Sequence, residues 1–189
     1  PGFRRQAFRT FTQVDGLPNC DIMALHQDRE GVLWLGTEGG GVVRYDGASY
    51  AVMTMEHGLP GNYVRAFAEE ADGGLWIVLV RAGAWAESGV CRYDGTHLTR
   101  LDAADGMPAA LVWDVVVDQD GAVWFATGAG ATRYDGETLT NYTDEDGLVP
   151  GALSSAAVDC RGRVWFGSDG SGVSRFNGQR FTTFDGGDG

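Results

Sequence analysis

The feature that most constrains this 189-residue chain is a fourfold internal repeat. Each copy carries a Trp at a fixed place, and these residues, at positions 34, 76, 124 and 165, lie 42, 48 and 41 residues apart. A Gly follows the same spacing at positions 16, 58, 106 and 147, in the segments DGLP, HGLP, DGMP and DGLV. A period of about 40 to 45 residues indicates an array of stacked units.

Each copy has the pattern of short antiparallel strands joined by tight turns. In the first copy, apolar segments at 22–27, 32–35, 42–45 and 49–53 are separated by DREG at 28–31, a Gly-rich stretch and DG at 46–47. Asp at the start of such a turn can accept hydrogen bonds from the backbone, and Gly can adopt positive φ. No segment of ten or more residues has a 3.6-residue apolar period, so almost no helix is expected.

Four strands per repeat predict an all-β fold, a β-propeller or propeller segment of four four-stranded antiparallel blades. The boundaries expected from the repeat are a fourth-strand segment at 1–14 that precedes the first full repeat, then blades at 15–56, 57–104, 105–145 and 146–189. The second blade carries an inserted loop near 80–89.

The order DGLP, then Asp-x-x-Gly-x-x-Trp, then Gly-Thr or Gly-Ser, then Gly-x-x-Arg-Tyr-Asp-Gly resembles the two-component regulator propeller repeats. These repeats occur in the sensor regions of bacterial hybrid histidine kinases, and the resemblance spans residues 15 to 189. The fourth copy departs from it, because it lacks the Pro of DGLP and has Asn177-Gly178 in place of Asp-Gly. The resemblance implies an extracytoplasmic, periplasmic sensor domain of a two-component system.

The two ends of the chain repeat each other. Residues 8–16 (FRTFTQVDG) match residues 181–189 (FTTFDGGDG). Two alternatives follow: the four blades belong to a longer propeller, or they close a ring alone or with another chain. We expect further blades, supplied by the same protein or by a second copy.

Composition excludes several functional classes. With 14 basic and 26 acidic side chains, the formal net charge is −12, so binding to nucleic acid is not expected. No apolar run approaches the roughly 18 to 20 residues of a membrane span, so no membrane insertion is expected. The three Cys residues occupy different repeat positions and define no disulfide framework.

The first strands hold the best ligand-binding candidates. Alignment on the repeat Trp places Met23, Arg65, Trp113 and Ser154 in one column, with Asp21 and Tyr63 two residues earlier. Side chains two apart share a face of a strand. These columns vary while their neighbours stay aliphatic, as expected for a surface that faces the central channel. The alternative is a polar channel lining without a ligand.

The insertion in the second copy adds two further candidates, Arg81 and Trp85, with Glu87 nearby. An aromatic and charged side chains on an added loop favour function, because binding residues concentrate on loops. The alternative is that Trp85 covers a neighbouring blade.

No metal, cofactor or catalytic site is expected. The acidic turn at 118–121 resembles part of a calcium loop, but the residue at the place of the distal Glu is Thr127. The three His residues lack ligand spacing, and there is no nucleophile elbow, P-loop or dinucleotide-binding motif. A lyase or hydrolase would need His and carboxylate groups that converge at one mouth of the channel.

These observations together predict non-catalytic recognition of a small molecule, glycan or protein at the channel and loop face. The alternative is a structural or assembly module, in which the blades form a larger propeller with further blades or another copy as a homo-oligomer.

Overall fold

The computed structural model describes residues 10–81 and 84–187 and confirms the all-β fold. Four antiparallel sheets of four strands follow one another along the chain, and we call them blades 1 to 4. Blade 1 comprises β1 (Ile22–Gln27), β2 (Leu33–Thr37), β3 (Val42–Tyr45) and β4 (Tyr50–Met53), and blade 2 comprises β5 (Tyr63–Glu69), β6 (Leu75–Arg81), β7 (Ala84–Tyr93) and β8 (Leu98–Leu101). Blade 3 comprises β9 (Val112–Val117), β10 (Val123–Thr127), β11 (Gly130–Tyr134) and β12 (Leu139–Tyr142), and blade 4 comprises β13 (Leu153–Val158), β14 (Val164–Ser168), β15 (Val173–Phe176) and β16 (Phe181–Phe184).

The helices in the described residues are three single 3₁₀ turns, η1 (Gln13–Asp15), η2 (Met55–His57) and η3 (Asp144–Asp146). Each lies before a first strand and begins after a Thr that forms a capping box with the third helical residue. None of the helices in the described ranges has the length and apolar character needed to cross a membrane.

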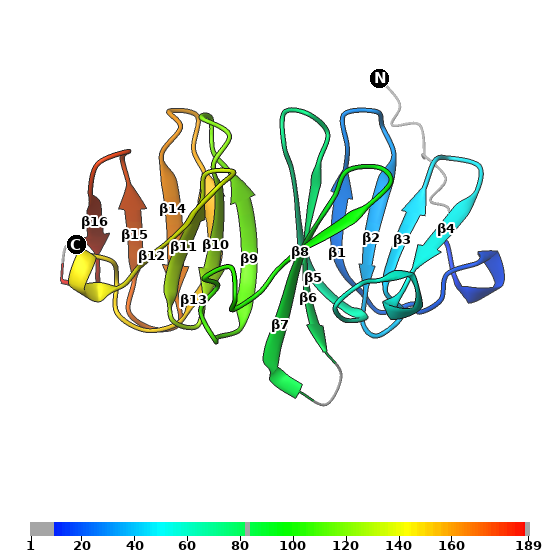
Figure 1. Cartoon of the computed structure of the whole chain (residues 1–189), viewed down its shortest axis with the longest axis horizontal. Helices are drawn as coiled ribbons and strands as arrows, with labels where there is room; N and C mark the ends of the chain where they lie inside the picture. The colour runs from blue at the N-terminus through cyan, green and yellow to red at the C-terminus, as the bar shows by residue number, and fades with distance from the viewer. Residues whose placement is uncertain (1–9, 82–83, 188–189) are drawn as a thin grey trace, which may run out of the picture.

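The blades stand side by side, and their first strands pack together in chain order: β1 against β5, β5 against β9, and β9 against β13 (Figure 1). The hairpin turns β1–β2, β5–β6 and β13–β14 lie at the upper end of Figure 1, and the 3₁₀ turns lie at the lower end. Among the described residues, no comparable packing joins β13 to β1, so blades 1 and 4 each present one outward face.

The hairpin between the first two strands depends on the Asp that begins its turn. Asp28 Oδ1 accepts hydrogen bonds from the backbone nitrogens of Glu30 (3.0 Å) and Val32 (2.8 Å). Gly31 closes this turn with φ of +85°, a conformation that side-chain-bearing residues rarely adopt. The same arrangement recurs at Asp118 and Asp159. The turn chemistry predicted from the sequence is therefore observed.

The repeat Trp fills the space between one blade and the next. Trp34, Trp76 and Trp124 are buried in three successive inter-blade clusters. In each cluster, the indole packs on aliphatic and aromatic side chains of the following blade, which buries large apolar areas. Trp165 has the corresponding position in blade 4, where its indole is half-buried because no blade of the described chain follows.

The insertion in the second repeat differs from its expected form. It lengthens two strands rather than forming a loop, because β6 continues to Arg81 and β7 begins at Ala84. The hairpin extends below the other blades in Figure 1. Trp85 therefore belongs to a strand. Of the segment expected as a fourth strand at 1–14, residues 1–9 lie outside the described residues, and residues 10–12 form no strand.

Candidate functional site

A β-bulge interrupts every first strand at the same repeat position. The register between first and second strands shifts between Ile22 and Ala24, between Val64 and Ala66, between Ala126 and Thr127 opposite β9, and between Leu153 and Ser155. The residues that the register skips are Met23, Arg65, Trp113 and Ser154. A bulge re-aims the side chain of its extra residue and is common next to binding sites. The column that we aligned from the sequence is therefore a row of bulge residues, which we call the bulge row.

Two members of the bulge row contact each other across a blade junction. The guanidinium carbon of Arg65 lies 5.0 Å from the centroid of the Trp113 ring. Both side chains are half-buried, so each keeps a surface open to a ligand. A cation over an indole is stabilised by the ring quadrupole. The remaining members are exposed: Met23 carries half of its surface to solvent, and Ser154 is exposed as well.

Asp21 and Tyr63 lie two residues before Met23 and Arg65 of the bulge row. Asp21 is exposed, precedes β1 and accepts a 2.9 Å hydrogen bond from the backbone nitrogen of Glu38 through its own carbonyl. Tyr63 begins β5 and forms a β-bridge with Glu38, so both residues border the β2–β3 loop of blade 1. Burial alternates through the bulge in β5, where Tyr63 and Arg65 are half-buried and Val64 between them is buried.

A half-buried carboxylate joins two first strands beside the bulge row. Asp114 Oδ2 accepts a 2.9 Å hydrogen bond from the backbone nitrogen of Ala156 in blade 4, and Oδ1 accepts one from Val115. Burial raises the pKa of Asp114, although both hydrogen bonds favour the ionised form. No equivalent residue of the other repeats is acidic: the residues at this position are Ala24, Ala66 and Ser155. Asp114 thus fixes β9 relative to β13, beside Trp113.

The other two candidates belong to the long β6–β7 hairpin. Arg81 ends β6 and Trp85 lies in β7, in the hairpin that extends below the other blades in Figure 1. Their side chains lie outside the part of the structure that can be described. The structure thus brings Arg65 and Trp113 into contact, and it does not test Arg81 or Trp85.

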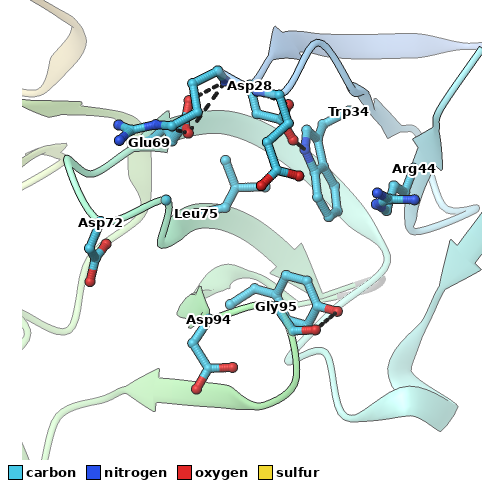
Figure 2. A pocket seen from close by; sticks show the side chains of 12 residues that line it. Asp28, Trp34, Arg44, Glu69, Asp72, Leu75, Asp94 and Gly95 are labelled. Carbon is cyan, nitrogen blue, oxygen red and sulfur yellow. Dashed lines mark hydrogen bonds and ion pairs between the residues drawn. The ribbon is translucent and has the colours of Figure 1, made fainter.

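A separate hollow, which the sequence did not indicate, opens between blades 1 and 2 at the opposite end (Figure 2). It has a volume of about 530 Å³. Figure 2 shows Trp34 and Arg44 of blade 1 on one side of the hollow and Asp72 and Asp94 of blade 2 on the other. Arg29 closes one edge, where its Nε donates a 2.8 Å hydrogen bond to Glu69 Oε1.

This hollow recurs at the other junctions. A cavity of about 540 Å³ lies between blades 3 and 4 at the equivalent place, with Arg133, Asp118 and Asn177 in its wall. A third lies between blades 2 and 3, beside Arg92 and Tyr134. Because the same turns produce a hollow at each junction, these hollows follow from blade stacking. The bulge row differs from them, since its side chains change from blade to blade.

No group of three or more His, Cys, Asp or Glu side chains in the described ranges is arranged to hold a metal ion. Cys91 is buried, and burial raises the pKa of its thiol to about 12. Cys20 and Cys160 are exposed and free.

Two segments of the chain, residues 16–39 and 58–79, match the family model described as two component regulator propeller. They cover the first half of blade 1 and the first half of blade 2, including Trp34 and Trp76. None of the curated proteins compared matches the chain significantly.

Solved structures share the fold. The extracellular domain of the hybrid two-component system BT3049 from B. thetaiotaomicron has a TM-score of 0.78 at 22% identity over 91% of this chain. The extracellular domain of the one-component system BT4673 from the same organism gives 0.75 at 19% identity over 94% of this chain. This chain covers 24% and 26% of those two chains, about a quarter of their length.

A more distant likeness is to an enzyme. Virginiamycin B lyase from Staphylococcus aureus has a TM-score of 0.66 at 14% identity, over 90% of this chain and 57% of the lyase. At this level of identity the likeness concerns the fold, which does not determine function. The matched segments show two-component regulator propeller repeats at residues 16–39 and 58–79, and the four four-stranded blades continue the same architecture along the described chain.

Proposed function

We propose that this chain is a non-catalytic recognition module of a sensor-type domain in a two-component system, and that it acts outside the cytoplasm. The binding surface is the bulge row together with the neighbouring β6–β7 hairpin. A small molecule, glycan or protein segment would lie across the first strands and contact several blades at once.

The observation that carries this proposal is the contact between Arg65 and Trp113. A uniform scaffold of bulges presents four chemically different residues, and two of them combine a flat indole with a guanidinium. Indoles stack on flat or apolar ligand faces, and Arg pairs with carboxylates through a planar fork. The match to two-component regulator propellers and the likeness to extracellular domains support the sensor context.

Binding across first strands offers a mechanism for signalling. A ligand that contacts Arg65 in blade 2 and Trp113 in blade 3 favours the blade arrangement in which those contacts are made. Ligands shift conformational equilibria only through such differential contacts. Asp114, which joins β9 to β13 beside Trp113, transmits a change of this spacing to blade 4.

A ligand screen tests the proposal. We expect a panel of sugars, oligosaccharides and small carboxylates, measured by thermal shift and then by titration calorimetry, to contain a binder of the unmodified chain. Trp113→Ala and Arg65→Ala should each weaken its affinity at least about tenfold, which corresponds to about 1.4 kcal/mol.

The matched control is Arg161→Ala, which removes an exposed guanidinium from the hollow between blades 3 and 4 at the other end of the molecule. Affinity unchanged in this variant and reduced in the two bulge-row variants supports the proposal. Equal affinity of Trp113→Ala and the unmodified chain contradicts it.

A further inference from the structure

The outward face of blade 4 exposes apolar side chains that other blades bury. Val173 is 37% exposed, whereas its repeat equivalents Val42 and Val90 are 0% and 2% exposed because the next blade covers them. Phe184, the cross-strand partner of Val173, is also exposed and stacks on the half-buried Trp165 with ring centroids 5.7 Å apart. This face has the composition of an inter-blade core without its second half.

The outward face of blade 1 is the complementary half. Leu25 is 65% exposed, whereas its repeat equivalent Val115 is 2% exposed and packs in the cluster that contains Trp76 of the preceding blade. Leu25 pairs with Leu35, and Leu35 pairs with Val43, so these side chains form one apolar row across the sheet. Within the single chain, Leu35 and Val43 are buried in a cluster against which Phe11 packs, so Leu25 is the exposed end of the row. This row would accept the Trp of a preceding blade.

We propose that the outward face of blade 4 in one copy of this chain binds the outward face of blade 1 in a second copy, head to tail. The interior junctions supply the template. Trp124 of blade 3 packs on Phe166 and Phe176 of blade 4, with ring centroids 5.8 and 4.9 Å apart. In the intermolecular junction, Trp165 takes the place of Trp124 and meets Leu35 and Tyr45, the repeat equivalents of Phe166 and Phe176.

Charge favours the same pairing. The guanidinium carbons of Arg163 and Arg175 each lie 5.6 Å from the centroid of the Trp165 ring. Arg163 is ion-paired with Asp159, so Arg175 supplies the positive charge beside this indole. At the junction of blades 1 and 2, Arg44 and Asp94 line one hollow. Their equivalents in the intermolecular junction are Arg175 and Asp46, which again have opposite charge.

One contact within the chain competes with this association. Phe11 packs against Tyr45 and Tyr50 on the blade 1 face, with ring centroids 5.4 and 6.1 Å apart. Its repeat equivalent is Phe184, so Phe11 and the Phe184 of a second copy would occupy the same place on the outward face of blade 1. Docking must displace Phe11, and a variant that weakens its contacts should therefore associate more tightly.

The two faces differ: the outward face of blade 4 supplies the Trp165 indole, and the outward face of blade 1 receives it. Such heterologous interfaces form closed rings when the rotation closes and open assemblies when it does not. Two copies would supply eight blades, which lies within the range of about four to eight that closed propellers use.

Sedimentation velocity over a range of protein concentrations tests the proposal with the chain as it exists. We expect a species of at least twice the monomer mass that grows with concentration. Leu25→Asp and Val173→Asp should each abolish it, since each places a charge in one half of the junction. Both side chains are solvent-exposed in the single chain, so both variants should keep the unmodified fold, checked by circular dichroism.

Mixing the two variants distinguishes this geometry from any other. Val173→Asp keeps an unaltered outward face of blade 1, and Leu25→Asp keeps an unaltered outward face of blade 4. These two faces should bind each other, so the mixture should form a heterodimer through one junction. Thr140→Asp, on the exposed outer strand β12, is the control and should associate as the unmodified chain does. Phe11→Ala should raise the associated fraction.

A monomer at every concentration, in both the unmodified chain and Phe11→Ala, overturns the proposal. Self-association that persists in Leu25→Asp or in Val173→Asp also overturns it. So does a mixture of these two variants that forms no heterodimer. These outcomes are independent of ligand binding at the bulge row, because neither substituted residue belongs to it.

Discussion

The indole nitrogen of Trp124 donates a 2.8 Å hydrogen bond to Oδ2 of Asp118, six residues earlier in the turn between β9 and β10. The same bond, at the same distance, joins Trp34 to Asp28 and Trp165 to Asp159. One carboxylate thus closes its turn through Oδ1 and fixes the buried indole through Oδ2. Blade 2 departs from this arrangement, because the equivalent residue is Glu70 and the buried Nε1 of Trp76 has no hydrogen-bond partner.

Glu70→Asp should repair this defect. The longer Glu side chain pairs instead with Arg92 Nε at 2.5 Å, and Arg92 also pairs with Asp72 at 2.6 Å. The shorter carboxylate would accept from Trp76, while Arg92 keeps Asp72. A buried donor without a partner costs about 1 to 3 kcal/mol, so a net gain of about 1 kcal/mol in unfolding free energy is expected, measured by urea denaturation. The reverse change, Asp118→Glu, should destabilise blade 3 by a similar amount. A loss in the first variant would contradict this account of the turn.

Two glycines at one repeat position test where blades touch. A Cβ at Gly36 would lie 2.5 Å from Val64 Cγ1 in blade 2, whereas a Cβ at Gly167 would meet only the Ser155 hydroxyl, which can rotate. Gly36→Ala should therefore cost about 1 to 3 kcal/mol through overpacking, and Gly167→Ala less than about 0.5 kcal/mol. Thermal denaturation of the two variants at one low concentration checks this. Equal losses of stability in the two variants would show that another blade already covers the outward face of blade 4 at this concentration.

Much of the fold was predictable because local rules repeat four times. Asp at the turn start and Trp six residues later fix a hairpin and a core residue in the same short segment, so the strands from β1 to β16 follow from the spacing. Tertiary effects were not predictable. The sequence of the insertion near 80–89 suggested a loop, whereas cross-strand pairing extends β6 and β7, and nothing local distinguishes the two.

The bulge row was predictable as a column but not as a set of bulges. Met23, Arg65 and Trp113 stood out by variation, whereas their positions at register shifts depend on the ladder to the second strand. The contact of Arg65 with Trp113 depends on the distance between neighbouring blades, which no repeat spacing encodes. The role of Asp114 was missed, although an acidic residue where the other copies have Ala or Ser was a visible signal.

The stability contributed by Asp114 should depend on pH. Burial raises its folded-state pKa above the unfolded value near 3.8, so the folded chain holds this proton more tightly than the unfolded chain does. The unfolding free energy should therefore fall as pH rises from 3.8 through the folded pKa. Asp114→Asn lacks this titration, so its stability relative to the unmodified chain should improve between about pH 4 and pH 7.

Urea denaturation of both proteins at the two pH values measures this difference. Asn keeps one acceptor for Ala156 or Val115, and the loss of the other is common to both pH values, so it cancels in the comparison. The account is contradicted if the difference in unfolding free energy between Asp114→Asn and the unmodified chain is the same at both pH values. It is also contradicted if Asp114→Asn becomes relatively less stable as pH rises.

The three thiols should differ in reactivity. Burial raises the pKa of Cys91 to about 12, so almost none of it is thiolate near neutral pH, whereas Cys20 and Cys160 are exposed. An aromatic disulfide reagent should titrate two thiols in the folded chain and three in denaturant. Rapid reaction of a third thiol without denaturant would mean that blade 2 opens locally.

Nuclear magnetic resonance of the indole groups tests recognition at the bulge row most directly. Each of the six Trp residues gives one indole resonance, and substitution of Trp34, Trp113 and Trp165 assigns the three that matter. On titration with a binder from the screen, the resonance of Trp113 should shift in proportion to occupancy while that of Trp165 stays in place. A shift of Trp34 or Trp165 with Trp113 unmoved would place the ligand elsewhere and contradict the proposed site.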